Sequence, residues 1–250
     1  MSRSCLTGAT TIYVGSTRTY TTLQSAWNYA QQSLDLCGYP LTFQVDDGTY
    51  TDDFTAVGPL VGGNESTILF QGNSVGPDNC LINAPNSCFG AACGACYTVN
   101  GFELKSGNGN CITAGAGSRV VFGEIDFGQT DGCHIMAWAG GYVEGNGANY
   151  YISGGAQAHY KLDSWGMIII NPCEVQLTTS CAFTYFCQAG TGSGCFKNLT
   201  FNGVGAGTNS TGTRYVVNEG AVVLVNGEGD GYFPGGYVGS VDASTYSIYV

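Results

Sequence analysis

Residues 110–143, NCITAGAGSRVVFGEIDFGQTDGCHIMAWAGGYV, contain the pattern that decides the fold. Short apolar segments alternate with corners that contain Gly or Asn, and the same pattern returns further along the chain. Alignment of five segments on one column gives steps of 22, 25, 25 and 30 residues. The aligned residues are Cys111, Cys133, Ala158, Phe183 and Thr213. A repeat of this length is typical of a solenoid.

Two further columns follow the first one. The second contains apolar residues at 120–122, 142–143, 168–170, 195–196 and 222–224, and the third contains Ile125, Ile152, Val175 and Leu199. Each unit therefore holds about three short strands, as one coil of a parallel β-helix requires. We expect an all-β, right-handed parallel β-helix, because the rival β-sandwich does not predict columns in register across successive units.

One amphipathic helix is expected near the N-terminus. Thr21 and Gln24 match a capping box, and apolar residues then recur at helical spacing until Cys37-Gly38. The recurring residues are Leu23, Ala26, Trp27, Ala30 and Leu34. The predicted helix spans residues 22–36 and covers the N-terminal end of the solenoid, where unpaired backbone would otherwise face water.

The whole chain, 1–250, is interpreted as a single domain. Residues 1–40 form the lead-in strand and the capping helix, residues 41–235 the coils, and residues 236–250 a C-terminal strand. After residue 40 the helical spacing gives way to strand-like alternation, as in Leu41, Phe43 and Val45.

The composition narrows the possible functions. The net charge is −11 with 7 Lys+Arg, so no phosphate-binding surface is expected and nucleic acid is excluded as a partner. No apolar run approaches the roughly 20 residues of a membrane helix, and the first residues lack the apolar stretch of a secretory signal. The 12 cysteines nevertheless suit an oxidising environment. A protein that is made in a cytoplasm and later exposed outside reconciles these features.

The stretch Thr11 to Tyr50, TIYVGSTRTYTTLQSAWNYAQQSLDLCGYPLTFQVDDGTY, resembles the start of phage- and prophage-associated parallel β-helix proteins, which are pectate-lyase-like and tailspike-like. In that family a short strand, a capping helix and a strand ending in a DGTY turn open the solenoid. Residues 151–159, 212–217 and 232–236 are similar to later parts of such proteins. The resemblance implies a virion protein, made in the host cytoplasm and exposed on the virion surface, that associates as a homotrimer. It implies no catalytic residues that can be mapped onto this chain.

Four cysteines have a spacing that is compatible with a metal centre. Cys88, Cys93 and Cys96, with Cys111 downstream, match the ligand spacing of a plant-type 2Fe–2S cluster, and the Cys-x2-Cys pair alone suits Zn²⁺. The alternative is a disulfide-stapled loop, or thiols that pack as small apolar residues. We favour the alternative and expect no cofactor.

The two histidines fall in one column of adjacent coils. His134 is expected to point outward, because its neighbours Cys133 and Ile135 point inward, and His159 then stacks beside it. Such a pair is a candidate metal or proton-transfer site. A surface or inter-subunit contact is the favoured interpretation.

A pair of carboxylates would carry any enzymatic function. Glu124 and Asp126 lie two residues apart on a strand and therefore share a face at about 6.5 Å, which is within the range that glycoside hydrolases use. Glu144 on the next coil would extend this patch. The favoured alternative is a solvated face or a trimer contact.

Exposed aromatic side chains would suit stacking against sugar rings. The candidate glycan contacts are Trp138, Tyr142, Tyr150 and Trp165. Most of the remaining Tyr and Phe residues are expected in the core or at interfaces.

Two functions are consistent with these features of the chain. The first is a structural or adhesion protein of a phage virion (a tail spike, fibre or capsid decoration) that contacts the host surface and other virion proteins. The second is a polysaccharide-degrading lyase or glycoside hydrolase that acts on a host surface glycan. We favour the first, and with it a non-enzymatic role. A secreted, disulfide-rich defence or cell-wall protein is a third interpretation.

Overall fold

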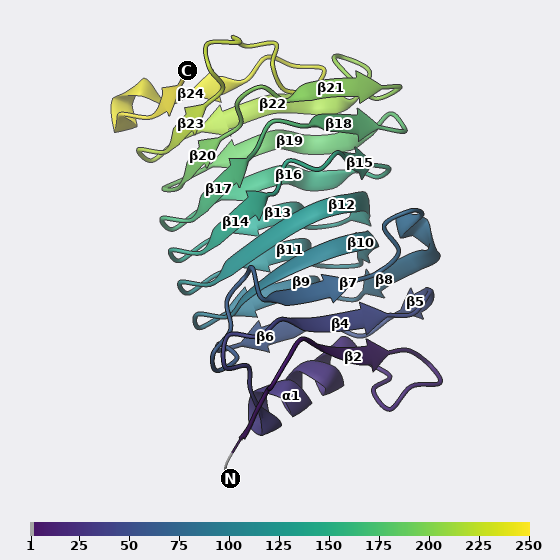
Figure 1. Cartoon of the computed structure of the whole chain (residues 1–250). Coiled ribbons are helices and arrows are strands. Elements are labelled where there is room, and N and C mark those ends of the chain that lie inside the picture. The colour runs from purple at the N-terminus through teal and green to yellow at the C-terminus, as the bar shows by residue number, and fades with distance from the viewer. Residues whose placement is uncertain (1–2) are drawn as a thin grey trace.

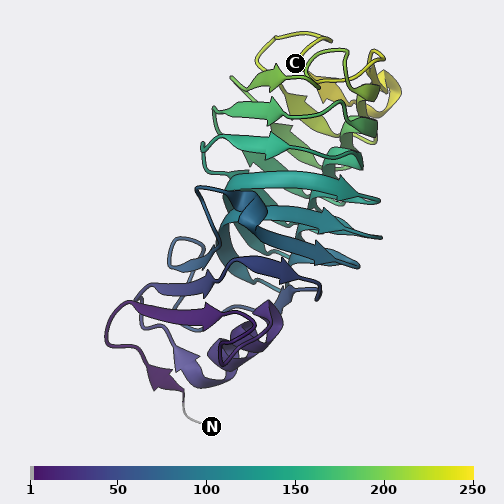
Figure 2. The ribbon, with the colours of Figure 1, turned by 90° about the vertical axis from the view of Figure 1, so that its right-hand side faces the viewer.

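The strands of this chain pair in parallel and stack into a solenoid. A computed structural model describes residues 3–250, and the sheets that it contains are built from parallel pairs between successive coils. The coils rise in order along the chain, and the ends of the chain lie at opposite ends of the stack (Figures 1 and 2). The predicted parallel β-helix with one capping helix is confirmed.

Each coil has three faces, and the strands of one face form a continuous ladder. Face 1 contains β2 (Thr10–Val14), β4 (Leu41–Val45), β7 (Ile68–Gln71), the first halves of β10 (Cys96–Ser106) and β12 (Arg119–Thr130), β14 (Tyr142–Gly145), β17 (Met167–Ile170), β20 (Ser193–Cys195), β23 (Val222–Leu224) and β25 (Ile248–Tyr249). Face 2 contains β5 (Gly48–Tyr50), β8 (Cys80–Ala84), the second halves of β10 and β12, β15 (Tyr150–Ile152), β18 (Glu174–Leu177) and β21 (Thr200–Gly203). Face 3 contains β6 (Thr55–Val57), β9 (Ser87–Ala92), β11 (Asn110–Ala114), β13 (Cys133–Ala137), β16 (Ala156–Leu162), β19 (Ala182–Ala189), β22 (Thr211–Val217) and β24 (Ser240–Val241).

The remaining elements lie outside the three ladders. Strands β1 (Ser4–Cys5) and β3 (Leu34–Asp35) form a small separate sheet. Two short 3-10 helices, η1 (Pro77–Asn79) and η2 (Ala243–Thr245), lie on connections between strands. Strand β2, which was predicted as a lead-in, pairs with β4 and is therefore the first strand of face 1.

The helix α1 spans Leu23–Ser33 and is shorter than predicted at its C-terminal end. Thr22, and not Thr21, is the N-cap, because its hydroxyl accepts a hydrogen bond from the backbone N–H of Ser25 at 3.1 Å. The helix stops at Ser33 because Leu34 turns to extended backbone and pairs with β1. Among residues 3–250 no helix is both long and apolar enough to span a lipid bilayer.

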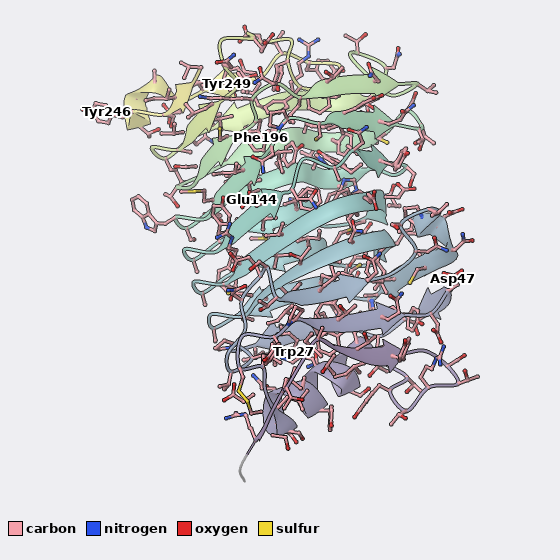
Figure 3. All side chains as sticks on the ribbon, in the orientation of Figure 1. Trp27, Asp47, Glu144, Phe196, Tyr246 and Tyr249 are labelled. Atoms are coloured by element: carbon pink, nitrogen blue, oxygen red, sulfur yellow. A yellow bond between two sulfur atoms is a disulfide. The ribbon has the colours of Figure 1, made fainter. Side chains whose placement is uncertain are left out.

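Helix α1 closes the N-terminal end of the core through one large side chain. Trp27 is fully buried and its ring lies about 6 Å from those of its aromatic neighbours, at the position that Figure 3 labels. These neighbours are Phe43, Phe54, Phe70 and Tyr97. Side chains from several of the first coils therefore meet at a single indole.

The second predicted column is confirmed as a ladder on face 1. Val120 pairs with Val143, and Val143 pairs with Ile168. The third column is shifted by two residues, because Ile152 pairs with Phe127 and not with Ile125.

The first column is correct at one step and slips at others. Cys133 pairs with Ala158 as predicted, but Ala158 pairs with Tyr185 and not with Phe183. Tyr185 in turn pairs with Thr213. The corner between β18 and β19 is longer than the one between β15 and β16, and corner length cannot be read from the spacing of apolar residues.

One corner of the coil recurs with two consecutive residues in the left-handed region. The second of them is glycine at Cys37-Gly38, Cys93-Gly94, Ala116-Gly117, Ala139-Gly140 and Glu219-Gly220. At Ser164-Trp165 the second residue is instead Trp165, with a φ of +66°, and the next coil has no left-handed pair at this corner. A residue with a Cβ in this conformation costs about 1–2 kcal/mol, so the coil displays this indole, 80% exposed, at a cost in stability.

We predict that Trp165→Gly leaves the free energy of unfolding unchanged or raises it by up to about 1 kcal/mol, because glycine adopts this conformation without strain. The matched control is Gly140→Ala in the neighbouring corner, which should lower it by about 1 kcal/mol. Urea denaturation measures both. A clear loss of stability in the glycine variant would contradict the argument from strain.

We predict that Trp27→Ala lowers the free energy of unfolding by about 3–5 kcal/mol, because the indole is fully buried and leaves a cavity among aromatic rings. Trp138→Ala is the control, since Trp138 is 41% exposed. Its expected loss is below about 1 kcal/mol. Equal losses in the two variants would be inconsistent with the role given to the capping helix.

Candidate functional site

A groove beside face 2 brings together two of the predicted carboxylates. Glu124 and Asp126 line it together with Asn149 and Tyr151. Residues 74–78, which lead into η1, form the opposite wall, and η1 contacts β10 and β12 (Figure 2). The groove has a volume of about 510 Å³. It is concave, mixes polar and apolar side chains, and has one wall built on strands, which hold side chains more precisely than loops do.

Asp126 is a carboxyl group in a perturbed environment. Burial raises its pKa, and the negative charges of Glu103 and Asp78 raise it further. A hydrogen bond with Ser153 and the charge of Lys105 oppose this shift without cancelling it. One carboxyl oxygen, Oδ1, is buried and has no hydrogen-bond partner. A carboxyl group that keeps its proton to higher pH than usual is suited to donate it.

Glu124 occupies a corner position that the adjacent coils fill with glycine. The strand register places it between Gly101 and Gly147, and the three residues have φ values of +77°, +46° and +92° in chain order. Only Glu124 among them carries a side chain, which accepts a hydrogen bond at Oε2 from Asn100 Nδ2 at 3.3 Å. The left-handed backbone costs about 1–2 kcal/mol at a residue with a Cβ. Strain of this kind collects at functional sites.

The charged residues that line the groove are all acidic: Asp78, Glu124 and Asp126. Glu103 stands beside Asp126 in the strand register and adds a further negative charge. The nearby cation, Lys105, has its Nζ 2.6 Å from the carboxylate of Glu103 and is neutralised there. The groove therefore presents a negative field.

Tyr151 is the aromatic side chain of the groove, and sequence reasoning selected its neighbour instead. Tyr150 was predicted as a glycan contact, but it is 1% exposed and belongs to the core. Tyr151 is 40% exposed and pairs with Asp126. The alternation of β15 held the signal, because Ile152 points inward and so requires Tyr150 to do the same.

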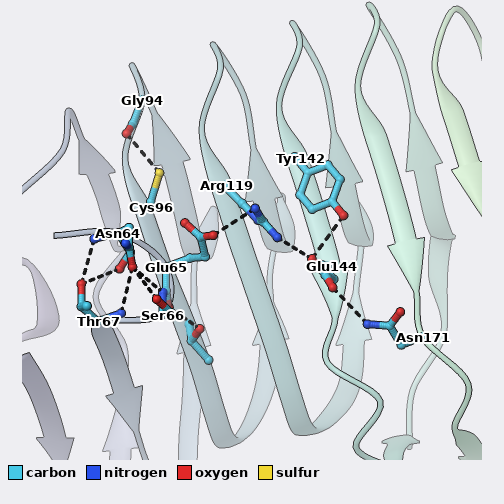
Figure 4. A network of polar contacts seen from close by, with 11 residues as sticks. Asn64, Glu65, Ser66, Thr67, Gly94, Cys96, Arg119, Tyr142, Glu144 and Asn171 are labelled. Atoms are coloured by element: carbon cyan, nitrogen blue, oxygen red, sulfur yellow. Dashed lines mark hydrogen bonds and ion pairs between the residues drawn. The ribbon is translucent and has the colours of Figure 1, made fainter. Parts of the chain in front are cut away.

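Glu144 does not line the groove but belongs to an ion-pair network on face 1 (Figure 4). Its Oε2 lies 2.7 Å from Arg119, whose guanidinium also pairs with Glu65 at 2.9 Å. Tyr142 and Asn171 donate further hydrogen bonds to the same carboxylate. The Arg119 guanidinium and these hydrogen bonds hold the pKa of Glu144 below its usual range, although burial opposes them. Glu144 is an ionised structural link between coils.

The other predicted glycan contacts lie at the far end of the face 1 strands. Tyr142 begins β14, and Trp138 and Trp165 lie in the corners before β14 and β17. Both indoles are exposed, but neither lines the groove. Contact of Trp138, Tyr142 and Trp165 with glycan stays a prediction.

The prediction that the histidines point outward is wrong. His134 and His159 are both fully buried, and their Nδ1 atoms lie 2.9 Å apart. The rings pack against Phe127 and Phe183. Strict alternation fails here because the first three residues of β13 are all buried.

The hydrogen bonds around the histidines fix their protons. The carbonyl oxygen of Gly128 lies 2.9 Å from His134 Nε2, so this nitrogen must carry a proton. His134 Nδ1 then accepts a hydrogen bond from the Nδ1–H of His159, and His159 Nε2 accepts one from the hydroxyl of Tyr150. Tyr160 continues the chain to Tyr150. Both imidazoles are neutral, and a further proton would set two donors against each other or reverse the chain.

The four cysteines with metal-like spacing do not converge. Cys88 and Cys111 are buried inside the core, whereas Cys93 is exposed in a corner and Cys96 begins β10 on face 1. Within residues 3–250 no three His, Cys, Asp or Glu side chains form a group that could hold a metal ion. Burial raises the pKa of Cys111 well above its usual range, which disfavours the thiolate that a metal requires.

A disulfide is present elsewhere, as expected for an oxidising environment. Cys5 and Cys37 are bonded with their Cα atoms 5.8 Å apart. The bond joins β1 to the segment that follows β3, so it ties the two ends of the capping region together.

The histidine pair predicts a loss of stability in mild acid. Burial lowers the pKa of His134 to about 4 and that of His159 well below 6.5, so the unfolded chain binds more protons below pH 6.5. The free energy of unfolding should therefore fall as the pH drops from about 6.5 to 4, by roughly 3 kcal/mol for His134 alone. Urea denaturation at stepped pH measures this change.

The same assignment can be tested directly by NMR. The chain contains two histidines, and neither imidazole signal should shift between pH 8 and about 5.5, since both rings stay neutral in the folded protein. A titration with a midpoint near pH 6.5 at either ring would contradict the buried, proton-fixed arrangement.

The groove offers Asp126 with a raised pKa, a strained Glu124 and an exposed Tyr151 within one concavity. Comparisons with protein-family models, with curated proteins and with solved structures find no match to this chain.

Proposed function

We propose that this chain is a structural or adhesion protein of a phage virion, such as a tail spike, fibre or capsid decoration, and that it contacts the host surface. In this proposal it is made in the host cytoplasm, assembles as a homotrimer with other virion proteins and is exposed on the particle. The groove beside face 2 is the part that meets a cell-surface polysaccharide.

The position of Glu124 is the observation that carries the proposed contact. The chain keeps a glutamate in a left-handed corner where both neighbouring coils use glycine. Such a residue lowers stability by about 1–2 kcal/mol, so a role outside the fold accounts for it best. The side chain lines a groove that also exposes Tyr151, whose ring offers a flat apolar surface to a sugar.

The negative charge of the groove limits the classes of glycan that it could bind. Asp78, Glu124 and Asp126 line it, and Lys105 is already paired with Glu103. A polymer of uronic acids would meet like charge in this groove. Neutral or amine-bearing saccharides fit the negative field of the groove.

The virion role is tested by locating the chain. Antibody against the purified protein, applied to particles from cultures of the source organism and viewed by electron microscopy, should label the particle surface. Label confined to cell walls or to soluble material would reject the role and favour a secreted protein.

A second candidate function uses the same groove, and the raised pKa of Asp126 favours it. In glycoside hydrolysis Asp126 would give its proton to the oxygen of the scissile bond while the bond to the sugar carbon breaks. Glu124 would act as base on the attacking water or as nucleophile. This function differs from adhesion in one measurable respect, since the bound glycan is cut.

We predict that Glu124→Gly separates stability from function. The free energy of unfolding should stay equal or rise by up to about 1 kcal/mol, whereas affinity for a neutral or amine-bearing oligosaccharide should fall about tenfold. Denaturation and isothermal titration calorimetry measure the two effects. Glu174→Gln is the control, because Glu174 is an outward carboxylate of face 2 outside the groove. Unchanged affinity in the glycine variant would remove the groove from the proposal.

Asp126→Asn distinguishes adhesion from hydrolysis. An adhesion protein should keep binding glycan and show no cleavage in either form, whereas a hydrolase should lose about 10²–10⁴-fold in cleavage rate with the asparagine. The release of reducing ends from the bound oligosaccharide measures the rate.

A further inference from the structure

The outer surface of face 1 changes character along the solenoid. In β17, β20, β23 and β25 none of the residues is charged. One outward column runs through Met167, Ser193, Val222 and Ile248. A second column beside it runs through Ile169, Cys195 and Leu224. We call the outward side of these four strands the neutral face.

The neutral face contrasts with the outer surfaces of the other two faces in the same coils. Face 2 carries Glu174 and Gln176 outward on β18, and face 3 carries Lys161, Gln188 and Arg214 outward on β16, β19 and β22. Outward positions of a solvated sheet are normally polar. Apart from Ser193, the outward residues of the two columns are apolar or weakly polar, and contiguous exposed apolar side chains mark an interaction surface.

An ion-pair network lies at the N-terminal border of the neutral face. Towards the N-terminus the columns continue into Tyr142 and Glu144 on β14. There Arg119 pairs with both Glu65 and Glu144, so its positive charge is offset within the chain and the three side chains together keep one formal negative charge (Figure 4). The guanidinium at this border is therefore not free to attract an acidic partner.

This charge distribution favours a second copy of the chain as the occupant. The chain carries a net charge of −11, so two copies repel each other through most of their surfaces. The neutral face is where that repulsion is weakest, and its Met, Ile, Val and Leu side chains gain from burial. Both columns run along the solenoid axis, so copies aligned side by side can repeat the same contact around a rotation axis.

We infer that the neutral face is the surface through which copies of this chain associate side by side. The homotrimer of the proposed function would use this surface, but association through it depends on neither a virion location nor glycan binding. Cys195, a half-buried thiol in the middle of the face, becomes covered in the assembly. Cys93, exposed in a distant corner, stays accessible.

The oligomeric state of matched variants tests this surface. Sedimentation velocity at about 1 and 100 µM should show the wild-type chain moving from 26.0 kDa towards a multiple of that mass. Ile169→Glu should stay at 26.0 kDa at both concentrations, because it buries an unpaired charge in the interface. Gln176→Glu is the control: it adds the same charge at an outward strand position of face 2 and should assemble like wild type. Thermal melts check that both variants fold.

The wild-type chain supplies a second readout that needs no variant. Alkylation of Cys195, followed by peptide mass spectrometry, should be several-fold slower at the higher concentration, whereas alkylation of Cys93 should not change. The inference would be overturned by a wild-type chain that stays monomeric at about 100 µM. It would also be overturned if the alkylation rate of Cys195 were the same at both protein concentrations. A monomer whose Cys195 is instead protected by oligosaccharide would reassign the neutral face to glycan. Assembly that persists in Ile169→Glu would place the interface elsewhere.

These tests can reject the proposed assembly surface and the proposed glycan contact independently of each other. Glu124→Gly and Asp126→Asn lie on the groove side and should leave the sedimentation of the chain unchanged. Loss of glycan binding with intact assembly would reject the proposed contact alone, and a monomer that still binds glycan would reject the neutral face alone.

Discussion

Parallel backbone pairing between successive coils is the constraint on which the rest of this molecule depends. Each strand forms its hydrogen bonds with the strands of the coils before and after it, so paired side chains stack in columns wherever the register is unbroken. A column that is apolar inside therefore becomes a continuous core, and a column that is apolar outside becomes a continuous surface. The same rule leaves the end coils unpaired, and it is why Trp27 of the capping helix meets rings from several of the first coils.

The coils of this chain differ most at their corners. At two of these corners a large side chain, and not glycine, projects from the solenoid. A left-handed corner suits glycine, so a glutamate or tryptophan there works against the stability of the coil. Glu124 replaces a glycine that both adjacent coils keep, and Trp165 replaces one that the preceding coil keeps; both present their side chains outside the core. Both side chains lie largely outside the apolar core, so core packing does not explain them. Such differences between the coils of one chain are the reason for choosing these positions for the proposed contacts.

The sequence predicted the solenoid because apolar alternation and the repeat length are direct consequences of stacking. It failed where geometry departs from strict alternation or where corner length varies. The first residues of β13 are all buried, so His134 points inward although its neighbours do too. The sequence could have distinguished the buried Tyr150 from the exposed Tyr151, because Tyr150 shares the inward face of the strand with Ile152. The shared location of Glu124 and Asp126 was predicted, but the wall at residues 74–78 comes from a loop more than 40 positions away and left no signal in the spacing.

Electrostatics divides the surface into parts that suit different contacts. The groove concentrates carboxylates, and burial with like charge keeps a proton on Asp126 to a higher pH than a solvated aspartate would. The neutral face holds no charged residue, and at its border the guanidinium of Arg119 is already paired with Glu65 and Glu144. In a chain of net charge −11 an acidic groove repels a second copy, whereas the neutral face does not. Side-by-side association through the neutral face would therefore leave the grooves pointing away from one another and open to ligand, because the two surfaces belong to different faces of the solenoid.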